Sequence, residues 1–90
     1  MEHEKLIKDT YDEFSSMSMD MTKDNAKEIL EKLHLLIMKI CPQLNEEECD
    51  YFRNRFEELN DALSYEEEAF KKVYYEVVSQ VSWKLKAMLN

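Results

Sequence analysis

Four segments of the chain carry hydrophobic residues at steps of three and four, the spacing that gathers side chains on one face of an α-helix. We therefore predict helices over residues 3–16, 23–41, 46–63 and 65–88. Small polar residues interrupt the pattern over residues 16–22, where we predict a loop. Three methionines of this loop are expected to fold over the end of the helices: Met17, Met19 and Met21.

Residues that start or stop helices stand at the edges of these segments. Thr22 can cap the second helix, and Pro42 cannot continue it, so that helix should end just before Pro42. Asn45 with Glu48 three residues later forms a capping-box pattern for the third helix, and Ser64 begins the same pattern before the fourth. The connections are therefore short, which favours antiparallel neighbours.

The composition supports an all-helical fold. The 90-residue chain contains no glycine and one proline, whereas the turns of sheet proteins depend on such residues. We predict an all-α protein, an antiparallel four-helix bundle or a compact irregular helical bundle, formed by one domain over residues 1–90. The residues expected to be almost fully buried are Leu33, Ile37, Phe52, Phe56, Val77 and Val81.

The net charge of −8 comes from about a quarter of the chain. Residues 44–68 contain ten carboxylates and two arginines, whereas the rest of the chain has ten acidic and ten basic residues. Six of these carboxylates belong to the first turns of the predicted third and fourth helices, where each stabilises the helix dipole by about 0.3–1 kcal/mol. Dipole complementarity therefore leaves part of the excess charge unexplained.

The remaining carboxylates lie opposite Phe52 on the third helix, at about 140 to 240 degrees around its axis, and Glu47 shares this side. Like charges at such spacings destabilise a helix by about a few tenths of a kcal/mol per pair, and solubility does not require concentrating them. We predict that they bind a cationic partner, the alternative being a solvated face. We call this set the acidic ridge: Glu47, Asp50, Glu57, Glu58 and Asp61.

Three large apolar residues fall outside the hydrophobic stripes. Trp83 lies about 120 degrees from Val77 on the fourth helix, and Leu35 and Met38 lie opposite Leu33 on the second. Either they are core residues, with Trp83 covering an edge of the bundle, or they form a contact surface, where Trp and Met are enriched. We include Trp83 among the candidate partner-binding residues.

Few residues suggest chemistry. Glu31 and His34 have the Glu-x-x-His spacing of di-iron bundles, but such a site needs two of these motifs, and we expect a surface pair. Phosphate-binding loops need glycine, and the Asp-x-Asp-x-Asp-Gly calcium loop is missing. No nucleophile, histidine and acid share a recognisable spacing. We therefore expect no enzyme, no cofactor and no bound metal.

The cysteines and the hydropathy bear on localisation. Cys41 and Cys49 flank the turn at Pro42, so a disulfide is conceivable, but we predict two reduced thiols that act as small hydrophobes. No apolar run reaches the about 18 residues of a membrane span, and the first residues, "MEHEK", have no signal-peptide pattern. We expect a cytoplasmic protein.

Two stretches resemble known families. Residues 11–37, with "YDEFSSM" and "AKEILEKLHLLI", are similar to the pediocin-type bacteriocin immunity proteins, small cytoplasmic four-helix bundles that are often basic, unlike this chain. Residues 71–84, "KKVYYEVVSQVSWK", resemble the tail of the haemolysin-expression-modulating family, helical partners of nucleoid proteins. They differ from it at Val78, where that family has proline, and at Ser82, which interrupts its Val-Trp pair. Both resemblances imply a helical protein that binds other proteins.

Together these features predict a non-enzymatic inhibitor or regulator, of the type that phages or mobile elements encode, that presents the acidic ridge to a basic surface of a nucleic-acid-handling protein. A carboxylate array can occupy the track of the phosphates, whereas direct contact with nucleic acid or a membrane is not expected. Two alternatives stay open. One is a bacteriocin-immunity or antitoxin-like protein that neutralises a toxin, and the other is a structural subunit or homodimer whose charge has no specific role.

Overall fold

The computed structural model describes residues 3–17 and 20–89, which form four α-helices and one short 3-10 helix without any strand. Each predicted helix is found within two residues of its expected ends, so the predicted all-α fold is confirmed. The helices are α1 (Glu4–Met17), α2 (Lys23–Ile40), α3 (Glu46–Ala62) and α4 (Glu67–Leu89), with η1 (Cys41–Gln43) between α2 and α3.

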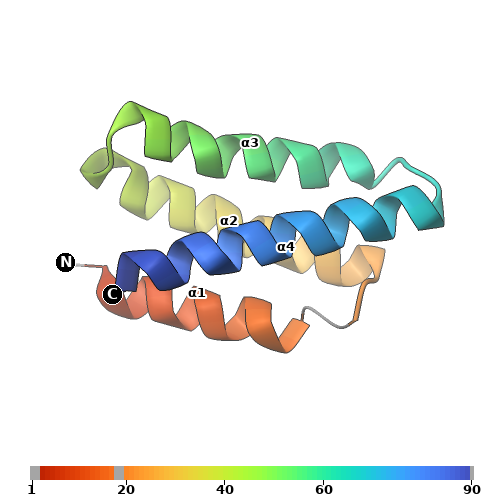
Figure 1. Cartoon of the computed structure of the whole chain (residues 1–90), viewed down its shortest axis with the longest axis horizontal. Helices are drawn as coiled ribbons and strands as arrows, with labels where there is room; N and C mark the ends of the chain where they lie inside the picture. The colour runs from red at the N-terminus through yellow and green to blue at the C-terminus, as the bar shows by residue number, and fades with distance from the viewer. Residues whose placement is uncertain (1–2, 18–19, 90) are drawn as a thin grey trace.

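Consecutive helices run in opposite directions, so that α1 begins and α4 ends at the same end of an antiparallel bundle (Figure 1). Each helix packs on two neighbours: α1 and α3 each lie between α2 and α4. The 23 residues of α4 span about 35 Å at 1.5 Å per residue, which sets most of the 39 Å length of the molecule. None of the helices in the described residues is both long and apolar enough to cross a membrane.

The predicted capping residues of α2 and α3 are confirmed. Thr22 Oγ1 accepts a hydrogen bond from the backbone N–H of Asn25 at 3.1 Å, and Asn45 Oδ1 accepts one from the N–H of Glu48 at 2.8 Å. Asn45 Nδ2 also donates to Glu48 Oε1 at 3.0 Å. Both caps satisfy backbone donors that the first turn of a helix leaves without a partner.

Ser64 does not cap α4 as its spacing predicts. Its hydroxyl donates to the carbonyl of Asp61 at 2.9 Å, and its backbone N–H bonds the same carbonyl at 3.2 Å. Ser64 therefore belongs to the turn that ends α3, and α4 begins at Glu67. A serine can bond backward to a carbonyl or forward to an N–H, and its spacing in the sequence does not distinguish the two.

One contiguous core receives side chains from all four helices. Of the six residues predicted to be almost fully buried, Leu33, Phe52, Val77 and Val81 are at most 2% exposed. The largest fully buried side chains include a group from every helix: Ile7 and Phe14 of α1, Ile29, Leu33 and Leu36 of α2, Phe52 and Leu59 of α3, and Phe70, Tyr74 and Leu85 of α4.

The prediction of near-complete burial is wrong for Ile37 and Phe56, which are half-buried and pack at the margin of the core. Both lie about 40 degrees round their helices from the central stripe residues Leu33 and Phe52. At that angle the two side chains reach the outer seam between α2 and α3. No other helix covers this seam in a four-helix bundle, so it stays open to solvent.

The connection between α1 and α2 is held against the core. Met17 and Met21 pack against it half-buried, as predicted, whereas Met19 lies outside the described residues. The buried Tyr74 donates its hydroxyl to the carbonyl of Met17 at 2.8 Å. Burial raises the pKa of Tyr74 to about 12, and the Asp20 carboxylate adds to this shift. Tyr74 therefore remains protonated and joins the end of α1 to α4.

Candidate functional site

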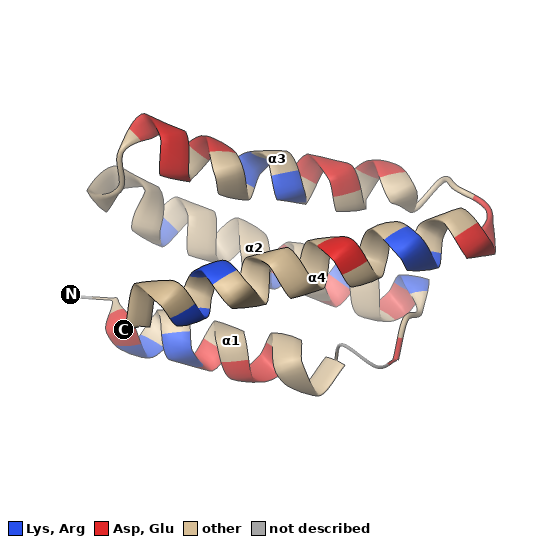
Figure 2. Cartoon of the chain, viewed as in Figure 1, with Lys and Arg blue, Asp and Glu red and all other residues tan. Residues whose placement is uncertain are grey.

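The acidic ridge runs along the outer side of α3. All five of its carboxylates are exposed, and Figure 2 shows acidic segments over most of the length of this helix. The exposure follows from the helical angle, because Phe52 and Leu59 on the opposite side of α3 are buried in the core. The structure therefore places all five residues on one helix face, where a partner can reach them.

Two arginines flank the ridge and differ in what they neutralise. Arg55 Nη2 lies 2.6 Å from Glu58 Oε1, and its guanidinium lies 5.1 Å from the ring centre of Tyr51. Arg53 lies 4.0 Å from Asp50 with both side chains more than half exposed, so this pair contributes little. Arg55 Nη1 also donates a hydrogen bond to Gln80 Oε1 of α4 at 3.3 Å. Arg55 is thus fixed toward α4, whereas Arg53 is only loosely engaged.

A second cation neutralises the same α4 side of α3. Lys84 Nζ of α4 lies 3.9 Å from Glu48 and 5.7 Å from the ring centre of Tyr51. Glu47, Glu57 and Asp61 form no ion pair with any cation of the described residues. These three carboxylates therefore carry unpaired charge, and Asp50 is paired only weakly with Arg53.

An open groove lies between α2 and α3, beside the ridge. It has a volume of about 770 Å³, and α2, η1 and α3 all contribute to it. A smaller hollow of about 300 Å³ shares His34 and Phe56 with the groove and extends it toward Leu30 and Glu31. The groove is lined by His34, Ile37, Met38, Cys41, Pro42, Leu44, Asn45, Glu46, Cys49, Arg53, Phe56 and Glu57.

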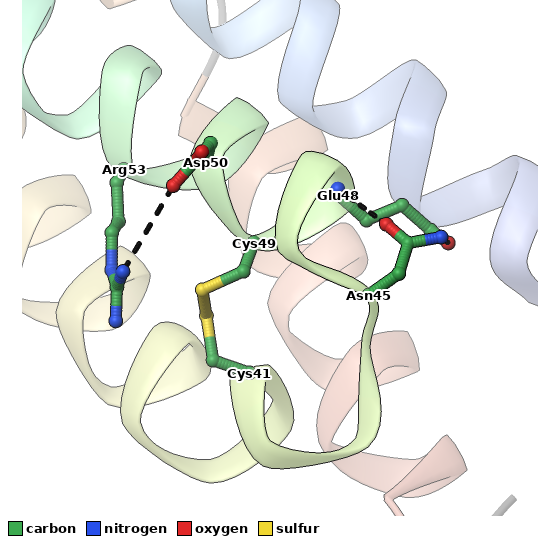
Figure 3. Close-up of a disulfide and its surroundings, with 6 residues drawn as sticks. All are labelled: Cys41, Asn45, Glu48, Cys49, Asp50 and Arg53. Atoms are coloured by element: carbon green, nitrogen blue, oxygen red, sulfur yellow. Dashed lines mark hydrogen bonds and ion pairs between the residues drawn. A yellow bond between two sulfur atoms is a disulfide. The ribbon is translucent and has the colours of Figure 1, made fainter.

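A disulfide lines one end of this groove and corrects the prediction of two free thiols. Figure 3 shows Cys41 of η1 joined to Cys49 in the second turn of α3, with Cα atoms 5.2 Å apart. The turn around Pro42 brings η1 back alongside α3, within the range that a disulfide can span. Because disulfides are rare in reducing compartments, the cysteines no longer support the expectation of a cytoplasmic protein.

The apolar residues outside the stripes are exposed rather than part of the core. Trp83 is 74% exposed on α4, which rules out the first of the two alternatives, that it covers an edge of the bundle. Met38 is 62% and Leu35 44% exposed on α2. Met38 lines the groove, whereas Leu35 and Trp83 line neither the groove nor its extension. Trp83 and the ridge therefore lie on different helices, and Met38 is the apolar residue that the fold brings close to the ridge.

Glu31 and His34 are both exposed and do not belong to a larger group of potential ligands. Within residues 3–17 and 20–89, no three histidine, cysteine or acidic side chains are close enough to hold a metal ion. The ring of His34 lies 5.9 Å from that of Phe56, at an angle of 45°. His34 thus packs over the wall of the groove rather than pairing with Glu31.

Sequence reasoning found the ridge but missed the groove and its disulfide. The ridge follows from the angles of residues on a single helix, whereas the groove depends on how two helices and η1 are placed. The signal that could have indicated it was Met38, an apolar residue on the outer side of α2.

No protein-family model matches the chain, and no curated protein or solved structure is significantly similar to it.

Proposed function

We propose that this protein is a non-enzymatic acidic binding protein, an inhibitor or regulator that presents the acidic ridge to a basic surface of another protein. The observation that supports this best is the exposure of Glu47, Glu57 and Asp61 on one helix face without a cation of the described residues to neutralise them. Such charge attracts a cationic partner and accelerates its association.

The partner we favour is a nucleic-acid-handling protein, because basic surfaces are common where phosphates bind. A row of carboxylates can occupy such a surface in place of the phosphates. Small antagonists encoded by phages or mobile elements can act in this way. The ridge would then compete with nucleic acid for the partner and would not contact nucleic acid itself.

An immunity or antitoxin-like protein that neutralises a toxin is a second candidate, favoured by the four-helix bundle that it would share with the bacteriocin immunity proteins. A homodimer or structural subunit is a third, favoured by the exposure of Trp83 and Tyr75 on α4. A homodimer or structural subunit does not need the charge of the ridge, so reversal of that charge separates it from the first proposal. The identity of the captured partner separates a protein that neutralises a toxin from an inhibitor of a nucleic-acid-handling protein.

The test compares two variants of equal charge. Reversing Glu57, Glu58 and Asp61 to lysine changes the net charge from −8 to −2, since each reversal adds two positive charges. Three exposed acids away from the ridge provide the matched control with the same net charge: Asp9, Asp12 and Glu28, each to lysine.

Wild type and both variants are used to capture partners from host lysate at low and at high salt, followed by mass spectrometry. We expect the wild type and the control to retain the same amount of the same basic partner. The ridge variant should retain less of it by a factor of about ten or more. High salt should also weaken the wild-type complex. Equal retention by the ridge variant would mean that the ridge is only a solvated face.

A further inference from the structure

The groove between α2 and α3 adjoins the acidic ridge directly. Glu57 belongs to both, since it is a ridge carboxylate that also lines the groove. Glu46 lines the groove about 16 Å away, eleven residues earlier on α3. A chain that pairs with the ridge at Glu57 therefore lies within one side chain's length of the groove.

The groove offers an apolar surface that the bundle leaves uncovered. Met38 is 62% exposed, and Ile37 and Phe56 are only half-buried. Beside them lie Pro42 and the Cys41 side of the disulfide. An apolar hollow rimmed by polar groups is the usual form of a contact site, because its cover removes apolar surface from water.

The charges at the rim of the groove indicate the sign of the charge that a ligand should carry. Glu46 and Glu57 line the groove, and Glu31 lines its extension. Arg53 is the one arginine or lysine among the lining residues, so it offsets only one of these three carboxylates. The rim is therefore negative in balance, and it favours a ligand that carries lysine or arginine next to its apolar residues.

We propose that the groove binds an amphipathic basic helix of the partner protein, whose apolar side chains pack on Met38 and Phe56 while its lysines or arginines pair with Glu46 and Glu57. This inference rests on the proposed function. It adds which structural element of the partner binds in the groove. The ridge attracts the partner, and the groove holds it.

A helix fits the groove better than an extended segment does. The backbone groups of α2 and α3 are bonded within their own helices, so they offer no free edge to which a strand could add. Along α3 the groove extends from Glu46 to Glu57, about three helical turns or roughly 16 Å. This length accepts two apolar side chains one turn apart, the spacing by which a helix fills a groove.

The disulfide prepares the groove for its ligand. It ties η1 to α3 at the end of the groove and so holds Pro42 and Leu44 in place before binding. A wall that is already ordered does not have to be ordered on association, which favours affinity.

Two synthetic helical peptides of about 15 residues test this proposal. Both carry the same lysines and arginines, but one has leucine at positions i, i+3, i+4 and i+7, and the other has alanine there. Binding to the intact oxidised protein is measured by calorimetry at low salt and at about 1 M salt, where the Debye length is about 3 Å. Chemical-shift changes of the isotope-labelled protein locate each peptide.

Two exposed residues on α2 provide matched variants, Met38→Gln in the groove and Leu35→Gln outside it. Exposure of both side chains means that neither change removes a core residue. We expect the leucine peptide to bind about tenfold tighter than the alanine peptide and to shift the signals of Ile37 and Phe56. Met38→Gln should abolish this advantage, whereas Leu35→Gln should preserve it.

Several results would overturn the proposal. If both peptides bind equally, ignore Met38→Gln and are lost on reversal of Glu57, Glu58 and Asp61, the groove takes no helix, while the proposed function survives. If neither peptide binds at low salt, or if the leucine peptide binds the ridge reversal as tightly as the wild type, the proposed function fails as well. If the wild type is a dimer in solution that Met38→Gln dissociates, a second copy of the chain fills the groove instead.

Discussion

A single residue of this bundle contributes to stability according to whether its angle on the helix directs its side chain into the core. Leu33 and Leu35 belong to the same helix and differ by two positions, yet Leu33 is fully buried and Leu35 is 44% exposed. The contrast provides an internal control for the energy of the core.

Leu33→Ala should lower the free energy of unfolding by about 2–5 kcal/mol, because the substitution removes buried methyl groups and leaves a cavity. Leu35→Ala should change it by less than about 0.5 kcal/mol, as for most exposed positions. Urea unfolding followed by circular dichroism measures both. Equal losses for the two variants would contradict the assignment of Leu33 to the core.

Tyr74 makes the stability of the protein sensitive to high pH. Its pKa is raised to about 12 in the folded protein from the ordinary value of 10.0. The folded state therefore holds this proton more tightly than the unfolded state. The resulting contribution is fully present below pH 10 and is lost as pH rises toward 12.

We expect the free energy of unfolding to fall more steeply between pH 10 and 12 in the wild type than in Tyr74→Phe. At neutral pH the variant should be less stable by about 1 kcal/mol, because the carbonyl of Met17 loses its hydrogen-bond donor. Urea unfolding at a series of pH values checks both statements. Parallel pH profiles would show that another group controls the alkaline loss.

Between elements, the connection from α2 to α3 depends on a covalent bond as well as on packing. Cys41 and Cys49 are eight residues apart, and their disulfide joins η1 to the second turn of α3. The Asn45 cap lies inside the loop that the disulfide closes. The α2–α3 turn is therefore fixed from both sides.

Reduction of the disulfide should lower the free energy of unfolding by about 2–3 kcal/mol, the amount expected for restricting a short loop in the unfolded chain. Urea unfolding with and without dithiothreitol measures the loss. The variant that replaces Cys41 and Cys49 by alanine serves as the control, because the reductant should not change its stability. A titration that finds free thiols in the native oxidised protein would contradict the bond itself.

On the scale of the whole molecule, charge is distributed unevenly around the bundle. Arg55 and Lys84 neutralise the side of α3 that faces α4, whereas Glu57 lines the α2–α3 groove and forms no ion pair with a cation of the described residues. Charge and exposed apolar surface thus meet on one side of the molecule. This coincidence is the physical basis of both proposals.

The uneven charge also predicts which rate of binding changes when the ridge carboxylates are reversed to lysine. Once the partner is known, lysine at Glu57, Glu58 and Asp61 should mainly lower its association rate, because steering acts before contact is made. The association rate of the wild type should fall as salt rises, and that of the ridge variant should fall less. Surface plasmon resonance separates the two rates. A change confined to dissociation would contradict steering by the ridge.

The sequence by itself determined the features that depend on neighbours along one helix. The helical spacing of hydrophobic residues predicted all four helices, and Asn45 with Glu48 predicted the start of α3. The exposure of the ridge also follows from angles around a single axis. All these features depend on the residues of a single helix, so the pattern of residues along that helix contains the information needed.

Only the tertiary structure decided what happens between elements. Ile37 and Phe56 share the spacing of core residues but lie at a seam that no fifth helix covers. Cys41 and Cys49 form a disulfide because the turn at Pro42 brings η1 beside α3, and Trp83 is exposed because no helix covers its side of α4. Such outcomes depend on the position of one helix relative to another, which the periodicity of each helix does not specify.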